Sequence, residues 1–200
     1  MNYLYMYRMT VDRGVAPCVE NGILTLACCK GGQIRNNKII KTGLRYRIGS
    51  KKDADYENDN VYILGIHKNK FLYLAKVTKV ITMKEYFSDI CNGRTDGIYS
   101  LKDGVITKNN HLRSHGIHID PNENIRDIAG EYVLMSEDFI YLGADAVFNE
   151  LILNMGPKFR ETKLWSGIDA EIAIAECLKY KDNKKHTPTS PLKKKSGGCK

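Results

Sequence analysis

The clearest hydrophobic pattern of the chain lies between Asn58 and Asp89, where a short polar segment separates two long apolar runs. The first run reads VYILGI, the second reads FLYLAKVTKVI, and the HKNK between them has the composition of a turn. This arrangement predicts an antiparallel hairpin whose second strand is buried over most of its length. Thr82 and Glu85 have the spacing of a capping box, so we expect a short helix to begin there and to lie on the sheet.

Shorter patterns predict further strands. Alternation over residues 2–11 and the ILTLACCK run at 23–30 each predict one strand. Residues 39–48 have a period of two on both sides of Thr42-Gly43, which predicts an amphipathic strand pair. Residues 131–143 predict strand, turn and strand.

Two helices are expected in the last quarter of the chain. Residues 145–154 have helical spacing, and Ser166 with Asp169 predicts the start of a last helix. The buried stripe of that last helix is predicted to be Ile168, Ile172, Ala175 and Leu178. Together these elements predict an α+β fold over residues 1–180, with a small bent mixed β-sheet or partial barrel and about three flanking helices. Residues 181–200 contain almost no apolar side chains, so we expect a separate, disordered, lysine-rich tail.

Composition narrows the class of protein. Apolar residues make up 42% of the chain, which is enough for a core, and no apolar run approaches the roughly 20 residues that a membrane span needs. The N-terminus alternates like a strand and has no signal sequence, so we expect a cytoplasmic protein without a membrane partner. The six cysteines are scattered without metal-binding spacing, and we predict buried thiols, no metal and no cofactor.

The net charge of +8 belongs mainly to the C-terminal tail. Eight of the 31 basic and one of the 23 acidic residues lie between Lys179 and Lys200, which leaves 23 basic and 22 acidic residues in the body. The tail is therefore expected to contact anionic polymers without specificity. Nucleic-acid binding by the body requires a local basic patch.

The basic segment from 36 to 56 is the first candidate for such a patch. Arg45 and Arg47 flank Tyr46, and basic residues interleaved with an aromatic ring are typical of a ribbon that contacts phosphates. The alternative is an exposed edge hairpin whose charges prevent aggregation.

Three histidines lie close together in a glycine-rich region, at His111, His115 and His118. Their spacing has no accompanying carboxylate motif and no helical signal, so we do not expect a metal site. A loop that lines a cleft, with His115 as a hydrogen-bond donor or general base, fits the pattern better.

Several strings occur in a definite order along the chain. Asp12 to Pro17 read DRGVAP, and Gly22 to Lys30 read GILTLACCK, followed by Ile34-Arg35. Further strings lie at Asn58 to Val61, Tyr73 to Thr78, Glu85 to Phe87 and Val133 to Gly143. Over residues 3–145 this series resembles the second type of nucleotide modification associated domain. It departs from that family where Asn58 and Asn60 replace a glycine and an aromatic residue, and in the length of the segment 36–56.

The resemblance implies a link with enzymes that modify bases in phage and bacterial DNA, in a family whose own activity is not established. The strand order is also similar to PUA-like small barrels such as the ASCH and EVE domains, which hold nucleic acid or a flipped modified base in a cleft. The resemblance therefore implies a PUA-like partial barrel and a nucleic acid or modified nucleotide as partner.

The candidate ligand-binding residues are polar or aromatic side chains that interrupt apolar strings. Lys30 and Arg35 lie next to glycines, which allow a phosphate or base edge to approach closely, and tyrosines offer rings for stacking. The predicted set is Asp12, Lys30, Arg35, Tyr46, Asp138 and Tyr141. Ordinary surface charge at Lys30 and Arg35, and an Asx turn at Asp12, are the alternatives.

Three functions remain open on this sequence. The first is a binding module for nucleic acid or a modified nucleotide, and the second is an enzyme on such substrates with Asp12, Lys30, Arg35 and His115 as candidates. The third is a protein scaffold. No GxSxG, HExxH, Walker or deaminase motif occurs, although Cys28-Cys29-Lys30 leaves a lysine-activated thiolate as an alternative to buried structural cysteines.

Overall fold

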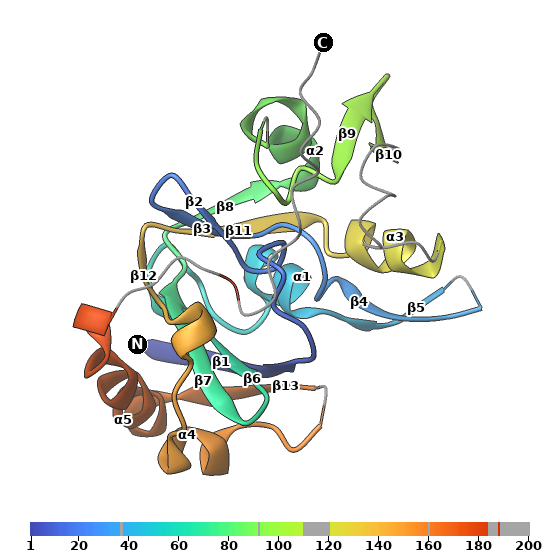
Figure 1. Cartoon of the computed structure of the whole chain (residues 1–200). Coiled ribbons are helices and arrows are strands. Elements are labelled where there is room, and N and C mark those ends of the chain that lie inside the picture. Colours follow the sequence, from blue (N-terminus) through green and yellow to red (C-terminus); the bar gives the residue numbers. More distant parts are fainter. Residues whose placement is uncertain (37, 92, 110–120, 160, 184–187, 189–200) are drawn as a thin grey trace.

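The computed structural model describes residues 1–200 except 37, 92, 110–120, 160, 184–187 and 189–200 (Figure 1). The described residues form two larger sheets, two separate two-stranded ribbons and five α-helices, and they form no closed barrel. The predicted α+β class with small mixed sheets is therefore confirmed, with more helices than the three expected.

The first sheet has five strands in the order β12-β7-β6-β1-β13. Its strands are β1 (Asn2–Met9), β6 (Asn60–His67), β7 (Lys70–Lys76), β12 (Asp138–Tyr141) and β13 (Thr162–Ser166). Only the β1–β6 pair is parallel, and the other pairs are antiparallel.

The second sheet has four antiparallel strands in the order β2-β3-β11-β8. They are β2 (Cys18–Glu20), β3 (Ile23–Leu26), β8 (Lys79–Thr82) and β11 (Tyr132–Ser136). The two ribbons pair β4 (Gly32–Arg35) with β5 (Lys38–Thr42), and β9 (Tyr99–Lys102) with β10 (Val105–Lys108).

Helices pack on the outer faces of both sheets, and one of them also contributes to the core between the sheets. The helices are α1 (Leu44–Gly49), α2 (Met83–Glu85), α3 (Pro121–Ile128), α4 (Glu150–Met155) and α5 (Gly167–Leu178). A π-helical turn, η1 (Tyr86–Ile90), continues α2, and short 3₁₀ turns lie at η3 (Gly143–Asp145) and η4 (Lys181–Asn183). Figure 1 shows α4 and α5 on one side of the first sheet and the second sheet on its other side.

Three apolar clusters hold these layers together. One lies between the two sheets and contains Tyr5, Tyr7, Leu26, Ile63 and Leu134. The second packs α4 and α5 on the first sheet, and the third packs η1 and β9 on the far side of the second sheet. Alternate residues of β1 therefore face two different cores, since Leu4 and Met6 belong to the second cluster.

The predicted hairpin and capping box are confirmed. Lys68 and Asn69 form the two-residue turn of the β6–β7 hairpin, and both have the positive φ that such a turn requires. The Thr82 side chain accepts from the Glu85 backbone, and the Glu85 carboxylate accepts from the Thr82 backbone. The second apolar run is not one strand, however, because β7 ends at Lys76 and β8 belongs to the other sheet.

The predicted strand pair at 39–48 is wrong in its second half. Ile39 and Ile40 lie in β5, which pairs with β4, but Leu44 to Gly49 form α1. Leu44 and Ile48 are spaced four residues apart and are buried together, so the apolar residues that fit a period of two also fit one helical face. The short length of the segment made the two periods hard to distinguish.

The predicted stripe of the last helix is also wrong. Ile168, Ile172, Ala175 and Leu178 are exposed, and α5 instead buries Ala170, Ala173, Ile174 and Cys177. Both faces of this helix carry apolar residues, and the smaller ones fit closely against β1. The helix expected at 145–154 begins only at Glu150, where Asn149 caps it by accepting from the Ile152 backbone.

The C-terminal tail was predicted from residue 181. Lys181–Asn183 still form a described 3₁₀ turn, η4. Of the remaining tail residues only Pro188 lies within the described part of the chain.

A row of residues crosses the first sheet on the face toward the second sheet. The pairing register places them side by side in the order Thr162, Tyr7, Gly65, Tyr73 and Tyr141. Gly65 is required in this row because a Cβ there would lie 2.2 Å from the ring atom Cε1 of Tyr73. The glycine thus lets the Tyr73 ring lean across β6 until its hydroxyl meets that of Tyr7, 2.6 Å away.

Substitution Gly65→Ala tests this close approach. We expect it to lower the free energy of unfolding by about 1–3 kcal/mol, because the methyl group forces the Tyr73 ring out of its position. Urea unfolding of the variant and the parent chain measures the change.

The control is the same substitution in a Tyr73→Leu background. There the methyl group no longer meets a ring, so Gly65→Ala should cost much less. Equal costs in the two backgrounds would show that the Tyr73 ring does not set the requirement for glycine.

Candidate functional site

The site is organised by a sharp turn at the end of β3. Cys29 and Lys30 both have positive φ, 61° and 53°, which residues with side chains adopt only when their surroundings hold them. The following Gly31 passes so close to α3 that a Cβ would lie 1.7 Å from the backbone oxygen of Arg126. Gly43 approaches the same turn from the other side, with its Cβ position 2.1 Å from the backbone oxygen of Lys30.

Two buried charged side chains hold this turn. The Arg45 guanidinium is fully buried, and its Nε donates to the Cys29 carbonyl at 2.7 Å. Its other nitrogens donate to the carbonyls of Tyr132, at 2.6 Å, and Asp127. The Asp127 carboxylate in turn accepts from the Cys29 backbone N–H at 2.6 Å and from the Tyr99 hydroxyl at 2.8 Å.

Arg45 therefore has a structural position, which corrects its predicted place on a phosphate-contacting ribbon. Burial lowers the pKa of the Arg45 guanidinium, and the nearby Asp127 charge acts against that shift. Gly130 makes room for the guanidinium, because a Cβ there would lie 2.4 Å from its central carbon. A side chain enclosed in this way has no surface to offer a ligand.

A pocket opens where this turn meets the β4–β5 ribbon, α1 and the start of β13. It has a volume of about 100 Å³ and is called the Lys30 pocket below. Its lining residues are Lys30, Gly32, Gln33, Lys41, Thr42, Gly43, Leu44, Arg47, Glu161 and Thr162. Three of them are basic and one is acidic, and the two threonines and the glutamine add hydrogen-bonding groups.

The Lys30 side chain forms the inner wall of this pocket. Its ammonium nitrogen lies 4.4 Å above the centre of the Tyr7 ring and donates to the Arg8 carbonyl at 3.3 Å. Arg47 is placed beside it by α1, where its Nε pairs with Asp53 at 2.7 Å. The row that crosses the first sheet from Thr162 to Tyr141 is called the tyrosine row below. It ends at the pocket, because Thr162 lines the pocket and pairs with Tyr7 in the sheet.

At its other end the row reaches Asp12. The Tyr141 hydroxyl donates to the two carboxylate oxygens of Asp12, at 2.9 and 2.8 Å, and both residues are buried. The row thus connects three of the residues predicted from the sequence, Asp12, Tyr141 and Lys30. Of these three residues, Lys30 alone lines the pocket, while Asp12 and Tyr141 are buried and do not line it.

The tyrosines of this row are neutral near pH 7. Burial raises the pKa of Tyr7, Tyr73 and Tyr141 above the ordinary value, and the Asp12 charge adds to the effect at Tyr141. They are therefore hydrogen-bonding phenols and do not supply a phenolate nucleophile.

The other predicted residues lie away from the pocket. Arg35 is exposed at the far end of β4, and Asp138 is exposed at the start of β12, opposite Lys76. Tyr46 is half-buried on α1, with its ring centre 6.2 Å from that of Tyr132. His115 and the two neighbouring histidines lie outside the described residues.

Sequence reasoning missed most of the pocket lining. Arg47 was named only as part of the predicted phosphate-contacting ribbon, Lys41 was not among the predicted site residues, and Glu161 and Thr162 carry no motif. Antiparallel pairing of β13 with β1 brings these last two residues to the site from more than a hundred residues away along the chain. No local signal indicates that pairing.

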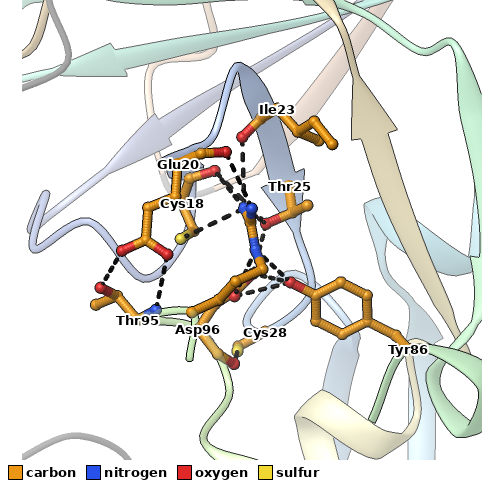
Figure 2. Close-up of polar contacts among 9 residues, drawn as sticks. Cys18, Glu20, Ile23, Thr25, Cys28, Tyr86, Thr95 and Asp96 are labelled. Atoms are coloured by element: carbon orange, nitrogen blue, oxygen red, sulfur yellow. Dashed lines mark hydrogen bonds and ion pairs between the residues drawn. The ribbon is translucent and has the colours of Figure 1, made fainter. Parts of the chain in front are cut away.

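A second buried polar cluster, also missed, holds the β2–β3 hairpin against the loop after η1 (Figure 2). The Arg94 guanidinium donates to the carbonyls of Glu20, Cys18 and Ile23 and lies 3.4 Å from the Asp96 carboxylate. Asp96 also accepts from Thr25 and Tyr86.

This cluster is internally satisfied. Burial raises the pKa of Asp96, while the Thr25 hydrogen bond, the Arg94 charge and the Tyr86 hydrogen bond act in the opposite direction. None of the residues drawn in Figure 2 lines the Lys30 pocket. The cluster therefore stabilises the fold.

The cysteines near the turn differ in their environment. Cys28 is fully buried, burial raises the pKa of its thiol, and its sulfur faces the Asp96 carbonyl at 3.7 Å. Cys29 is half-buried. Within the described part of the chain, no group of three or more histidine, cysteine, aspartate or glutamate residues is arranged to hold a metal ion.

Comparison with known proteins gives one match. A family model described as nucleotide modification associated domain 2 matches residues 1–162, which include the whole lining of the Lys30 pocket. No curated protein and no solved structure matches the chain. No helix among the described residues is long and apolar enough to cross a membrane.

The neighbouring arginines of α1 allow a matched test of their roles. We expect Arg45→Met to lower the free energy of unfolding by about 3–5 kcal/mol, because it leaves three buried carbonyls without their donor and removes the positive charge near the buried Asp127 carboxylate. Arg47→Met removes one partly exposed ion pair and a contact with the Tyr5 ring, and should cost only about 1 kcal/mol. Urea unfolding of both variants provides the measurement, and similar losses would contradict the structural role of Arg45.

Proposed function

The chain belongs to the nucleotide modification associated domain 2 family, and from that premise we propose that its folded body binds nucleic acid or a modified nucleotide at the Lys30 pocket. The family description links the chain to nucleotide modification. Lys30, Lys41 and Arg47 are the proposed contacts, and Asp12 and Tyr141 support them through the tyrosine row.

The observation that carries this proposal is the local charge. The pocket has three basic residues to one acidic residue, in a body where basic and acidic residues are nearly equal in number. Lysine and arginine side chains that converge with hydroxyl groups are the usual contacts of phosphate oxygens in proteins. The fold therefore gathers basic side chains at one place, although the composition of the body is nearly neutral.

The size of the pocket favours one kind of occupant. Sites that enclose a small molecule usually have volumes of about 300–1,000 Å³. At about 100 Å³ the Lys30 pocket fits a phosphate group of a ligand whose remainder lies outside it. A nucleotide within a strand, or one held partly by a neighbouring surface, meets this condition.

The rest of the chain has a supporting part in the proposal. We take residues 1–180 as one binding domain in the cytoplasm, and the lysines of 181–200 as a source of non-specific attraction to anionic polymers. Arg35, Tyr46 and Asp138 stay predictions, since their positions add no support to a role in this pocket, and His115 stays a prediction because it lies outside the described residues.

Binding of labelled oligonucleotides to the full chain at two salt concentrations tests the proposal. We expect Lys30→Ala and Lys41→Ala each to weaken binding several-fold and to reduce the slope of log affinity against log salt by about 1. Base-modified and unmodified oligonucleotides are compared in parallel, because a domain of this family that reads modification should prefer one of them.

Two control variants separate the pocket from general charge. Lys84→Ala removes an exposed lysine from α2, far from the pocket lining, and a triple change of Lys193, Lys194 and Lys195 to serine removes charge from the tail. If Lys30→Ala and Lys41→Ala affect binding no more than Lys84→Ala, the pocket is not the site. Binding that is insensitive to salt would favour a protein scaffold.

A further inference from the structure

A second, larger hollow lies near the Lys30 pocket. A phosphate bound in that pocket would leave this hollow empty. It has a volume of about 340 Å³ and is called the Phe159 hollow below. Its lining residues are Arg8, Met9, Thr10, Ile66, Lys68, Asn69, Lys158 and Phe159. It is formed by the end of β1, the β6–β7 turn and the segment before β13.

The hollow has an apolar interior. Met9 and Ile66 are buried beneath it, and the Phe159 side chain belongs to a residue that is 75% exposed. An aromatic ring left in water beside buried apolar side chains offers a face on which another flat ring can stack. Phe148 is also exposed, but of these two phenylalanines only Phe159 lines the hollow.

The rim of the hollow is basic. Arg8, Lys68 and Lys158 are lining residues, and no acidic residue is among them. The Arg8 guanidinium is held in place, because its NH1 nitrogen donates to Asn69 at 2.6 Å and its Nε donates to the Pro157 carbonyl. An apolar interior whose charged neighbours are all positive is complementary to a flat ring attached to a negatively charged phosphate.

The hollow and the Lys30 pocket have no lining residue in common, but they are connected through β1 and through the segment before β13. Lys30 lines the pocket, and its ammonium group donates to the carbonyl of Arg8, which lines the hollow. The same chain segment also serves both, since Lys158 and Phe159 line the hollow while Glu161 and Thr162 line the pocket. The two sites therefore lie at adjoining points of the chain, as a ligand that contacts both would require.

We propose that the Phe159 hollow is a stacking site for an unpaired nucleobase whose phosphate occupies the adjacent Lys30 pocket. This inference rests on the proposed function and specifies its ligand. A base inside a regular duplex has both faces covered by its neighbours, so it cannot stack on a protein ring. The ligand is therefore a single strand or a nucleotide turned out of a duplex, and the hollow has the volume of a site that encloses a small ring system.

An oligonucleotide that contains 2-aminopurine tests the proposal, because the fluorescence of this base decreases when it stacks. We expect the full chain to quench a single-stranded probe on binding. Phe159→Ala should weaken binding about tenfold and abolish the quenching, whereas Phe159→Trp should retain both. Phe159→Leu keeps an apolar side chain without a ring, so it should behave like Phe159→Ala.

Phe148→Ala is the matched control, because Phe148 is 68% exposed and does not line the hollow. Both phenylalanines are exposed, so neither substitution should disturb the core. A loss with Phe159→Ala that does not exceed that with Phe148→Ala would overturn the stacking site.

The form of the probe supplies the remaining comparison. A single strand and a duplex with one mismatched 2-aminopurine should bind more tightly than a fully paired duplex. Tight binding of the mismatched duplex would identify a base turned out of a duplex as a ligand. Equal binding of the fully paired duplex would overturn the proposal. If Lys30→Ala and Lys41→Ala weaken binding but Phe159→Ala does not, only the stacking site fails, and if none of the three does, the proposed function fails as well.

Discussion

The structure depends on one buried interaction, the set of hydrogen bonds that the Arg45 guanidinium makes with three backbone carbonyls. Those carbonyls belong to the turn after β3, to the end of α3 and to the start of β11, so one side chain fixes three segments that are far apart in the sequence. Breaking such an arrangement is costly, because the three carbonyls would remain buried without this donor and the buried Asp127 charge would lose its nearby positive charge. Its position also requires glycine at Gly130, which leaves room for the guanidinium, and at Gly31 and Gly43, where backbones pass each other closely.

The basic pocket is a consequence of this arrangement. Arg45 and Asp127 hold the backbone of Cys29 from both sides, so Lys30 leaves the turn in one direction and its ammonium group rests on Tyr7. Tyr7 is fixed in turn by Tyr73, which Gly65 allows to lean across the sheet. The binding groups are thus supported by a rigid core, and a preorganised site loses less conformational entropy when a ligand binds.

The distribution of charge separates two modes of attraction. The lysine-rich C-terminal segment gives the chain most of its net charge, whereas the body is nearly neutral and gathers basic residues around the Lys30 pocket and the Phe159 hollow. In the proposed function, the segment raises the rate of encounter with any polyanion, while the two proposed sites select a ligand by its shape and by an accessible base. The family to which the chain belongs is consistent with a ligand derived from nucleotides.

The sequence by itself determined the α+β class, the central hairpin, the capping box at Thr82 and the family, because each depends on local pattern or on an ordered set of strings. It also indicated Asp12, Lys30 and Tyr141, which the fold connects through one row of the sheet. Only the tertiary structure decided that Arg45 is buried while Arg47 lines a pocket, since the two residues look alike in the sequence. It also decided which of the two apolar faces of α5 is covered. The pairing of β13 with β1 brought Thr162 to the pocket that Lys30 lines. These outcomes depend on contacts between residues distant along the chain, and no local pattern of hydrophobic and polar positions contains that information.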